Sequence, residues 1–570
     1  MLGSYKSAAK SLYLCDLGKF CNIRSNMKAL SPVHSLHHIN TVASDVRIID
    51  PQHNAGDIDL LHQIGYKQEL RRHYTTLQVI GIPLSIMGSI VPSVASVLSM
   101  GLECGPAGLV WGWFIAGCLV FCVGLSLSFL GSAIPTSGGL YYYTNYYCPD
   151  KYRVPLSYLI GCSNSLGLMG AICSVTYGFA TEVMSAVSIS TDNNFEITNA
   201  KTYGVFAACI VTVTAVSTLT SRKAEKLQFM SIGVNIFLML LFFIAVPIGF
   251  SRHNSFNSRG FIFGKYENAR EWPIGWSAIM SFNTAIWAIG SFDSVIYCSE
   301  EALNAQRSIP VGILGSITIV WVLGWTVNVV CAACIKDGDT ARVLSTETRS
   351  AIAQIIYDAL GKRWAVAFMS LISVGQYLMS VSFITALSRQ IWSFARDDGL
   401  PIVYEFVKYV NPKLKVPVRA TIFAGTCALI MGCLCIIPGT AGSNALFSLA
   451  IASTNLAWGM PVFLVILPYG RKKFIPGPFY FGDTLTYSVN VITVLYIVFA
   501  IIMNMFPDNK HVDKDSMNYT CVINGGVWLL SVIYYYAWGW RSYTGPKSNL
   551  DGLESEEEKK LDEVLEEKDA

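Results

Sequence analysis

The sequence predicts an all-α, polytopic membrane protein, on the evidence of its composition and of the length of its apolar segments. Hydrophobic residues make up 52% of the 570 residues and charged residues only 14%, whereas soluble proteins carry roughly 25% charged residues. Each apolar segment is about 20 residues long, which is the length of helix needed to cross roughly 30 Å of hydrocarbon. A soluble globular protein is therefore excluded.

Twelve apolar segments follow one another along the chain. They lie near residues 76–100, 108–130, 156–187, 201–220, 227–250, 276–298, 311–335, 364–388, 416–437, 444–468, 485–506 and 521–540. Residues 1–74 form a polar stretch that we expect to be a disordered cytosolic tail. Residues 541–570 carry many acids and are expected to be a second, solvated cytosolic tail.

The lysines and arginines of the loops set the expected orientation, because basic residues accumulate on the cytosolic side. With the N-terminus in the cytosol, the inner loops hold basic stretches such as Arg471–Lys473, and the short outer loops at 101–107 and 438–443 hold none. The outer loops at 251–273 and 336–363 are also basic, but the rule is weaker for long loops. We therefore expect both termini in the cytosol.

Charge and cysteine content exclude several classes of protein. The net charge of +3 is spread along the loops without a basic stripe, which argues against a nucleic-acid partner. Most cysteines lie within apolar runs as small buried residues, and Cys331-x-x-Cys334 has no second pair to complete a zinc site. The spans hold no nucleophile–base pair. We expect no metal, no cofactor and no enzymatic activity, with the lipid bilayer as the surroundings.

The first apolar segment is interrupted at Ile86-Met87-Gly88-Ser89-Ile90-Val91-Pro92. A glycine, a hydroxyl and a proline stand together where a plain membrane helix would have leucine and alanine, so we expect the helix to open there. Amides and carbonyls freed in hydrocarbon are tolerated only where they face protein or a water-filled cavity. This stretch is therefore a candidate binding site.

The sixth apolar segment has a comparable weak point, five segments later. It reads Trp287-Ala288-Ile289-Gly290-Ser291-Phe292-Asp293. Interrupted helices at corresponding positions of two halves are typical of the midplane site of a secondary transporter. The two stretches together predict a substrate site between the halves.

Asp293 is the single carboxylate placed well within an apolar span and close to a predicted break. An acid inside the membrane favours a functional role, here the handling of a proton or of a substrate amine. The alternative is that Asp293 caps the second half of the segment by accepting a hydrogen bond from a freed amide. The two roles are compatible. Glu182 lies toward the outer end of the third segment and is expected at the interface.

Charged residues flank the sixth and eighth segments on the expected cytosolic side. Glu300 and Glu301 follow the sixth segment, and Arg389 and Arg396 follow the eighth. Pairs between them are predicted to latch an inner gate that breaks when the gate opens, and the alternative is ordinary loop solvation. On the outer side, residues 343–362 have apolar residues at helical spacing, which predicts either a lid helix over the vestibule or a surface helix.

Several stretches carry a resemblance to a known family. They are Ile86–Ser89, Val110–Ala116, Pro135–Tyr142, Ser163–Leu168, Gly290–Asp293, Ser299–Ala305 and Ser388–Pro401. With the twelve segments, they resemble the amino acid–polyamine–organocation (APC) transporters, and within these the fungal amino acid/choline branch. The chain is most similar to the 4-aminobutyrate (GABA) permeases. The resemblance runs from about Glu69 to about Trp540 and covers neither tail.

The resemblance implies the LeuT-like fold, in which five helices and the next five are related as inverted repeats. The transporter core would span residues 75–468, with repeats at about 75–250 and 274–468 and with the first and sixth helices broken. The segments at 485–540 would be the peripheral eleventh and twelfth helices.

The resemblance also implies where a substrate would bind. Its carboxylate would meet Ser89 and the backbone of Gly88 and Ile90, in agreement with the partial positive charge of a half-helix N-terminus.

The amine of the substrate would meet carbonyl groups near Ile86, Ala288 and Ile289, close to Gly290. The ring of Trp287 or Phe292 would add a cation–π contribution of about 0.5–2 kcal/mol, or both rings would only pack against neighbouring helices.

We predict that the coupling ion is a proton, because proton symport is usual in the fungal amino acid/choline branch; no single residue indicates it. Some proton-coupled relatives carry a lysine in the fifth segment, where this chain has Asn235. We expect a proton-linked permease that imports GABA or a related small amino acid at the plasma membrane, with the vacuolar membrane as the alternative site. A facilitator or exchanger is consistent with the same residues. A choline or polyamine permease is the alternative within the class, and a transport-poor nutrient sensor is the alternative outside it.

Overall fold

The computed structural model describes residues 61, 72, 74–192, 194–219, 224–411, 416–437, 441–513 and 517–547. Most of the two predicted tails, 1–74 and 541–570, lies outside these residues. Within them the regular elements are helices, apart from one isolated bridge between Tyr74 and Ala302. The all-α fold class is confirmed.

The membrane spans agree with the twelve predicted segments. In the described part of the chain, eleven helices are long and apolar enough to cross a membrane. They are α4–α5 (Thr76–Leu102), α6 (Gly105–Ala133), α8 (Arg153–Ser190), α9 (Asn199–Leu219), α10 (Ala224–Ser251), α15 (Ala305–Ala333), α17 (Ala351–Arg396), α19 (Val418–Gly432) continued by the turn η4 (Cys433–Ile436), α20 (Ala441–Ile466), α22 (Asp483–Met503) and α23 (Thr520–Ala537). The remaining segment, the sixth, is divided into the short helices α12 (Ile274–Met280), α13 (Asn283–Ala288) and α14 (Ser294–Tyr297).

The first span is broken where the sequence predicts, between α4 (Thr76–Met87) and α5 (Ile90–Leu102). Glycine is required at the break, because a Cβ on Gly88 would lie 2.2 Å from the carbonyl oxygen of Leu84. The second break separates α13 from α14, and Ser291 within it has a φ of 70°. Since α5 packs against α13 and α4 against α14, the two breaks lie side by side.

Small residues let the paired helices of the two halves approach closely. In α6, Gly117 meets the ring of Trp321 in α15, and Gly124 meets the side chain of Ile317 in the same helix; a Cβ at either glycine would come within 2.3 Å of its partner. Small residues at an interface are the usual means of packing membrane helices, because lipid supplies no hydrophobic drive between them. The second helix of one half is thereby fixed against the second helix of the other.

The predicted lid region is two helices rather than one. Helix α16 (Thr340–Leu344) ends before a six-residue connection, and residues 351–360 then form the first turns of α17, up to Gly361 with a φ of 75°. Ile352, Ile355 and Ile356 are buried. The apolar spacing in 343–362 therefore marks a packed helix that leads directly into the eighth span.

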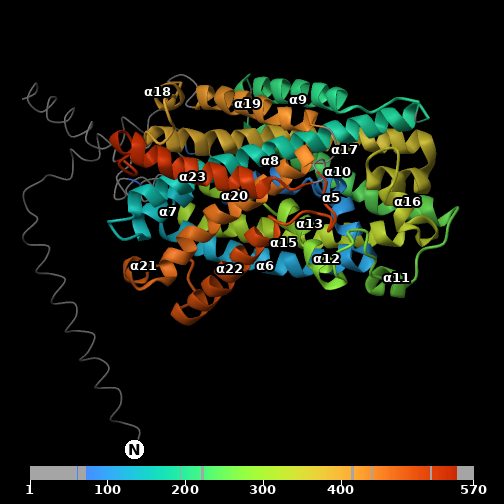
Figure 1. Ribbon diagram of the computed structural model, residues 1–570, viewed down its shortest axis with the longest axis horizontal. Coiled ribbons are helices and arrows are strands. Elements are labelled where there is room, and N and C mark those ends of the chain that lie inside the picture. Colours follow the sequence, from blue (N-terminus) through green and yellow to red (C-terminus); the bar gives the residue numbers. More distant parts are fainter. Residues whose placement is uncertain are drawn as a thin grey trace, which may run out of the picture. The chain divides into compact units, whose positions relative to one another are not determined.

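Short helices gather at the two ends of the spans (Figure 1). Helices α7 (Gly139–Tyr147), α18 (Tyr404–Val407) and α21 (Pro468–Lys473) lie at one end, and α11 (Arg259–Gly264) and α16 lie at the other. We call these the α7 end and the α16 end. The broken helices place the first candidate site between the two ends.

Candidate functional site

A cavity lies beside the two helix breaks, enclosed by spans from both halves of the fold. Its lining residues come from the breaks and from α8, α17 and α20; they are Ile86, Met87, Ala171, Val175, Ile286, Trp287, Ala288, Gly290, Ser291, Met379, Phe383, Ala450, Ile451, Thr454, Asn455 and Trp458. The cavity volume is about 30 Å³, which is room for about two water molecules.

Glycines in α8 bring α20 to this cavity. A Cβ on Gly167 would lie 2.8 Å from the backbone nitrogen of Thr454, and one on Gly170 would lie 3.2 Å from that of Ala450. Because α20 is held so close, its residues reach the helix breaks, and one wall of the cavity is built from α20.

Trp287 is the fixed aromatic wall of the cavity. Its indole Nε1 donates to Ser174 Oγ in α8 at 3.1 Å, and its ring packs against Phe447 with 5.2 Å between centroids. Phe292, the other predicted aromatic face, is fully buried and packs on Trp458 at 4.7 Å. Trp458 lines the cavity and Phe292 lies outside the lining, so Phe292 supports the wall rather than forming it.

The predicted substrate residues separate into two groups. Ile86, Trp287, Ala288 and Gly290 line the cavity. The others lie beside it outside the lining; they are Gly88, Ser89, Ile90, Ile289 and Phe292. The backbone of both breaks is thus present at the cavity, while the residues predicted for the carboxylate stand one layer behind.

Ser89 is fully buried at the start of α5, and among the described residues nothing forms a hydrogen bond with its hydroxyl. Its side chain does not cap α5. An unpaired buried hydroxyl carries a desolvation penalty of about 1–3 kcal/mol, and a bound acceptor would remove it. This hydroxyl, next to the positive end of a helix, fits an anionic group.

On the facing wall, α20 presents oxygen atoms that fit a cation. Asn455 donates its amide Nδ2 to the carbonyl of Ile451 at 2.8 Å, and Thr454 donates its hydroxyl to the carbonyl of Ala450 at 2.7 Å. Because each side chain spends a donor on its own helix, its remaining lone pairs are acceptors. No described residue donates to the Asn455 Oδ1 atom, and no basic residue belongs to the cavity lining.

Asp293 is fully buried beside the second break. It occupies the first position before α14, but its side chain makes no capping hydrogen bond. It accepts instead from the Tyr297 hydroxyl at 2.5 Å, and Asn164 of α8 donates to that hydroxyl at 2.9 Å. The capping role is therefore wrong, because the carboxylate faces the next turn of the segment. Its second oxygen, Oδ1, has no described partner within hydrogen-bond distance and angle, although the indole of Trp458 lies near the carboxylate.

Two further predictions concern polar groups in other spans. Glu182 was expected at the interface, but it is only 2% exposed in α8, and neither carboxylate oxygen has a partner among the described residues. The burial of Glu182 depends on which side of α8 faces the bundle, and the sequence around Glu182 does not indicate that side. Asn235, in α10, donates to the carbonyl of Ser231 at 2.8 Å, and its Oδ1 is likewise without a partner in the described part of the chain.

The four charged residues predicted for a gate meet at the α7 end as two buried ion pairs. Arg389 Nε donates to Glu301 Oε1 at 2.9 Å, and both side chains are only 5% exposed. Close by, the guanidinium of Arg72 donates to the carbonyl of Ala302 at 2.6 Å. The stretch that follows the sixth span is thus held from two sides.

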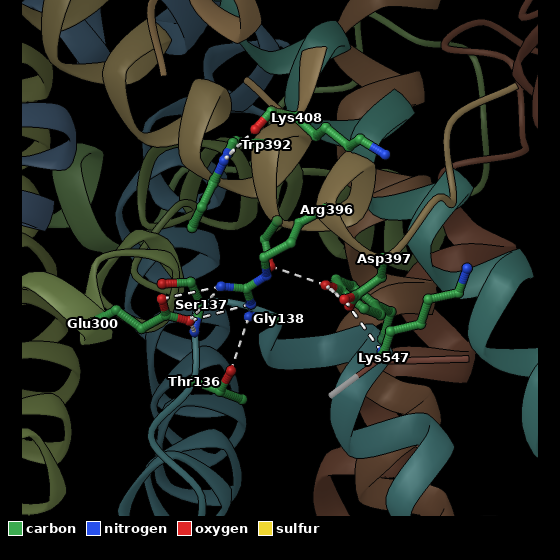
Figure 2. Close-up of polar contacts among 11 residues, drawn as sticks. Thr136, Ser137, Gly138, Glu300, Trp392, Arg396, Asp397, Lys408 and Lys547 are labelled. Atoms are coloured by element: carbon green, nitrogen blue, oxygen red, sulfur yellow. Dashed lines mark hydrogen bonds and ion pairs between the residues drawn. The ribbon is translucent and has the colours of Figure 1, made fainter. Parts of the chain in front are cut away.

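The second pair joins Arg396 to Glu300, with 3.2 Å between Nη1 and Oε2. Figure 2 shows the guanidinium of Arg396 directed at Glu300 and at the loop Thr136–Gly138. The backbone amide of Ser137 donates to the same carboxylate at 3.1 Å. The loop leads into α7 through Gly139, whose φ of 50° is a left-handed conformation that favours glycine. Ordinary loop solvation does not describe these four residues, since all are buried or nearly so.

Sequence reasoning missed the contributions of α8, α17 and α20 to the cavity. Ala171, Met379 and Asn455 stand in ordinary apolar stretches, and they reach the cavity only through packing between distant segments. The glycines at 167 and 170 are the one local signal, because small residues in a span mark a close helix contact.

The fold and the cavity together define a class of protein. Two interrupted helices meet beside a small cavity midway along the spans, and two buried ion pairs lie at one end; this is the organisation of a secondary transporter of the inverted-repeat type. Within the described residues, no group of three or more His, Cys, Asp or Glu could hold a metal ion.

Comparison with known proteins gives the family. The amino acid permease family model matches residues 74–527, and the chain belongs to this family, which is part of the APC superfamily. It is 46% identical to the GABA-specific permease of Saccharomyces cerevisiae over 94% of this chain and 93% of that protein. The resemblance stated from the motifs is confirmed.

More distant relatives belong to the same class. The chain is 30% identical to an uncharacterized amino-acid permease of Schizosaccharomyces pombe, over 87% of this chain and 90% of that protein. It is 26% identical, over 87% and 89%, to a Candida albicans protein whose name assigns it provisionally to polyamine transport.

Proposed function

We propose that this permease imports GABA, or a similar amino acid with a separated carboxylate and amine, by proton-linked alternating access. The observations that carry the substrate class are the unpartnered buried hydroxyl of Ser89 at the first break, outside the cavity lining, and the acceptor oxygens of α20 within the lining. In this proposal the negative end of the ligand reaches Ser89 and its positive end meets α20. The 46% identity to a GABA-specific permease supports the same choice.

In the proposed complex, the carboxylate lies at the start of α5, with Ser89 and the free amides of the first turn as donors. The ammonium group faces Asn455, Thr454 and the carbonyls of the broken helices. The face of Trp287 or Trp458 contributes about 0.5–2 kcal/mol through a cation–π contact. Met379 lines the cavity, and its flexible side chain can adjust to the shape of the ligand.

Asp293 is the proposed proton site. It is fully buried, its Oδ1 atom has no hydrogen-bond partner among the described residues, and it is the last residue of the second break, directly before α14. A proton on this carboxyl would be lost when the α7 end opens to a more alkaline compartment. Asn235 has no charge to exchange and is assigned a polar packing role near the first break.

The α7 end is proposed to face the cytosol, where the ion pairs of Arg389 and Arg396 form a closed inner gate. When the gate opens, both arginines and both glutamates lose their protein partners and are hydrated instead. The plasma membrane is the proposed location, with both termini cytosolic.

Uptake of labelled GABA tests the proposal. Cells that lack their own carriers would express the chain, and uptake would be measured at several external pH values with choline, putrescine and neutral amino acids as competitors. Saturable uptake that rises at acid pH and collapses with an uncoupler is expected. Saturable uptake of putrescine or choline without GABA uptake would show that the substrate is a cation. Exchange that does not depend on pH would show that transport is not coupled to protons.

A further inference from the structure

The last described residues of the chain do not form a solvated tail. After α23 the chain makes the turn η5 (Gly539–Arg541), and residues 542–547 then run along the α7 end. Tyr543 is fully buried there. We call residues 539–547 the C-terminal strap.

Tyr543 anchors the strap to the first turn of α8 and to α7. Its hydroxyl lies 2.6 Å from Ser157 Oγ, and Ser157 donates to the carbonyl of Tyr141 at 2.9 Å. Because the serine proton goes to this carbonyl, Tyr543 is the donor to Ser157. Burial raises the pKa of the Tyr543 phenol well above its usual value, so the donor keeps its proton at all physiological pH values.

The ring of Tyr543 also packs on the gate helix itself. Its centroid lies 5.7 Å from that of Phe394 in α17, in an edge-to-face arrangement. Phe394 stands between the two gate arginines, five residues after Arg389 and two before Arg396. The strap therefore contacts α17 within the turns that carry the gate.

The polar contacts of the strap reach the two acids that follow Arg396. The backbone amide of Lys547 donates to Asp397 Oδ1 at 3.4 Å, and its ammonium group contacts Asp398 Oδ2 at 2.6 Å. Figure 2 shows the division of roles, with Arg396 turned toward Glu300 and Asp397 turned the opposite way toward Lys547.

Asp397 is also bound from α7. The Tyr141 hydroxyl donates to Asp397 Oδ2 at 2.7 Å, and Ser393 lies 2.9 Å from the same hydroxyl. A carboxylate held between α7 and the strap cannot turn back to neutralise the adjacent arginine. Arg396 is therefore left to pair with Glu300.

We propose that Tyr543 and Lys547 are positioning residues of the gate: the C-terminal strap holds the end of α17 and directs Asp397 away from Arg396, which keeps the gate closed. The inference rests on the proposed function only in calling this cluster a gate. It predicts that loosening the strap raises the population of molecules opened at the α7 end, without any change at the substrate cavity.

Hydrogen–deuterium exchange of the purified full chain tests this without a substrate. In Tyr543→Phe, which keeps the ring and loses the hydroxyl, amide exchange in residues 136–141 and 297–303 is expected to rise by about three- to tenfold, the equivalent of one lost buried hydrogen bond. A chain that ends at Pro546 lacks Lys547 and should show a similar rise. The matched controls are Tyr536→Phe, at an exposed tyrosine of α23, and a chain that ends at Leu553.

The outcomes separate this inference from the transport proposal. Faster exchange confined to residues 538–547, with the gate segments unchanged, would overturn the positioning role and leave the strap as a docked end. Faster exchange at the gate, combined with no GABA uptake by the unaltered chain, would support the positioning role of the strap and reject GABA as the substrate. Where GABA uptake occurs, the two strap variants should also increase GABA efflux from preloaded cells by a similar factor, and the controls should not.

Discussion

The substrate cavity and the gate at the α7 end both bury polar groups, but they satisfy them differently. Beside the cavity, the Ser89 hydroxyl and the Asp293 Oδ1 atom are buried without a hydrogen-bond partner among the described residues. At the gate, both glutamates accept from arginines, and one also accepts from a backbone amide. The contrast lies in the charges: at the proposed gate each carboxylate is paired with an arginine, although the nearby Ser137 hydroxyl has no partner among the described residues, whereas Asp293 at the cavity has no described cation beside it. Paired charges are expected where the resting protein must stay closed, and an open hydrogen-bonding position is expected where a ligand completes it.

The difference predicts which measurement each region affects. Removing a partnered charge at the gate leaves its counterion buried and destabilises the unliganded protein. Removing an unpartnered group at the cavity weakens ligand binding without destabilising the unliganded protein. Thermal stability without substrate and KM for uptake should therefore separate the two regions.

Breaking one gate pair should have the largest effect. Arg389→Gln leaves Glu301 buried without its cation, and the loss of one partner of a buried pair costs about 3–5 kcal/mol. We expect a marked fall in the melting temperature of the purified protein, equal with and without GABA.

The double variant Arg389→Gln/Glu301→Gln should recover much of that stability, because no uncompensated charge remains. Arg307→Gln is the control, since Arg307 is exposed near the same end. A single variant as stable as the double variant would contradict the comparison.

Ser89→Ala should have the next largest effect, on binding rather than on stability. The hydroxyl's hydrogen bond to a carboxylate is worth about 1.5–3 kcal/mol, so KM for GABA should rise about tenfold to a hundredfold. The melting temperature without GABA should stay the same or rise, because the variant removes an unpaired buried hydroxyl.

Competition by putrescine, which has no carboxylate, should be unchanged in Ser89→Ala. Ser85→Ala is the matched control, because the Ser85 hydroxyl is satisfied by the carbonyl of Ile82 at 2.7 Å. Equal losses for GABA and putrescine would give Ser89 a purely structural role.

The sequence predicts features that arise from the local backbone, and it does not predict those that arise from contacts between segments far apart in the chain. The break at Gly88 and Ser89 is predicted because glycine, hydroxyl and proline act on the local backbone. Asn455 is not predicted, because it reaches the cavity through the contact between α8 and α20. The same reasoning explains Glu182: its burial depends on which side of α8 faces the bundle, and small polar and apolar residues are mixed around it without marking one side.

Asp293→Asn should change the pH dependence of uptake rather than its size at acid pH. If the carboxyl must be protonated before import, uptake at low GABA falls as external pH rises, by up to about tenfold per unit above its pKa. The amide variant has no proton to lose, so its uptake should vary little with pH.

Glu182→Gln is the companion experiment for the proton site, because Glu182 is also a buried acid of the spans, and neither of its carboxylate oxygens has a partner among the described residues. Its pH profile should match that of the unaltered chain. A flattened profile for Glu182→Gln with a normal one for Asp293→Asn would move the proton site from the second break to α8.

Trp287→Phe should have the smallest effect, and it sharpens the comparison because Trp287 is a cavity residue with a partner. The variant keeps the ring against Phe447 and loses the hydrogen bond to Ser174, which is worth about 0.5–1.5 kcal/mol. Both stability and KM should therefore change slightly, the KM by about two- to tenfold. Ser174→Ala should produce a similar change, and the double variant should add little to either, since both remove one interaction. If the double variant shows the sum of the two effects, the wall of the cavity is held by packing alone, and the distinction between satisfied and unsatisfied groups applies to the gate but not to Trp287.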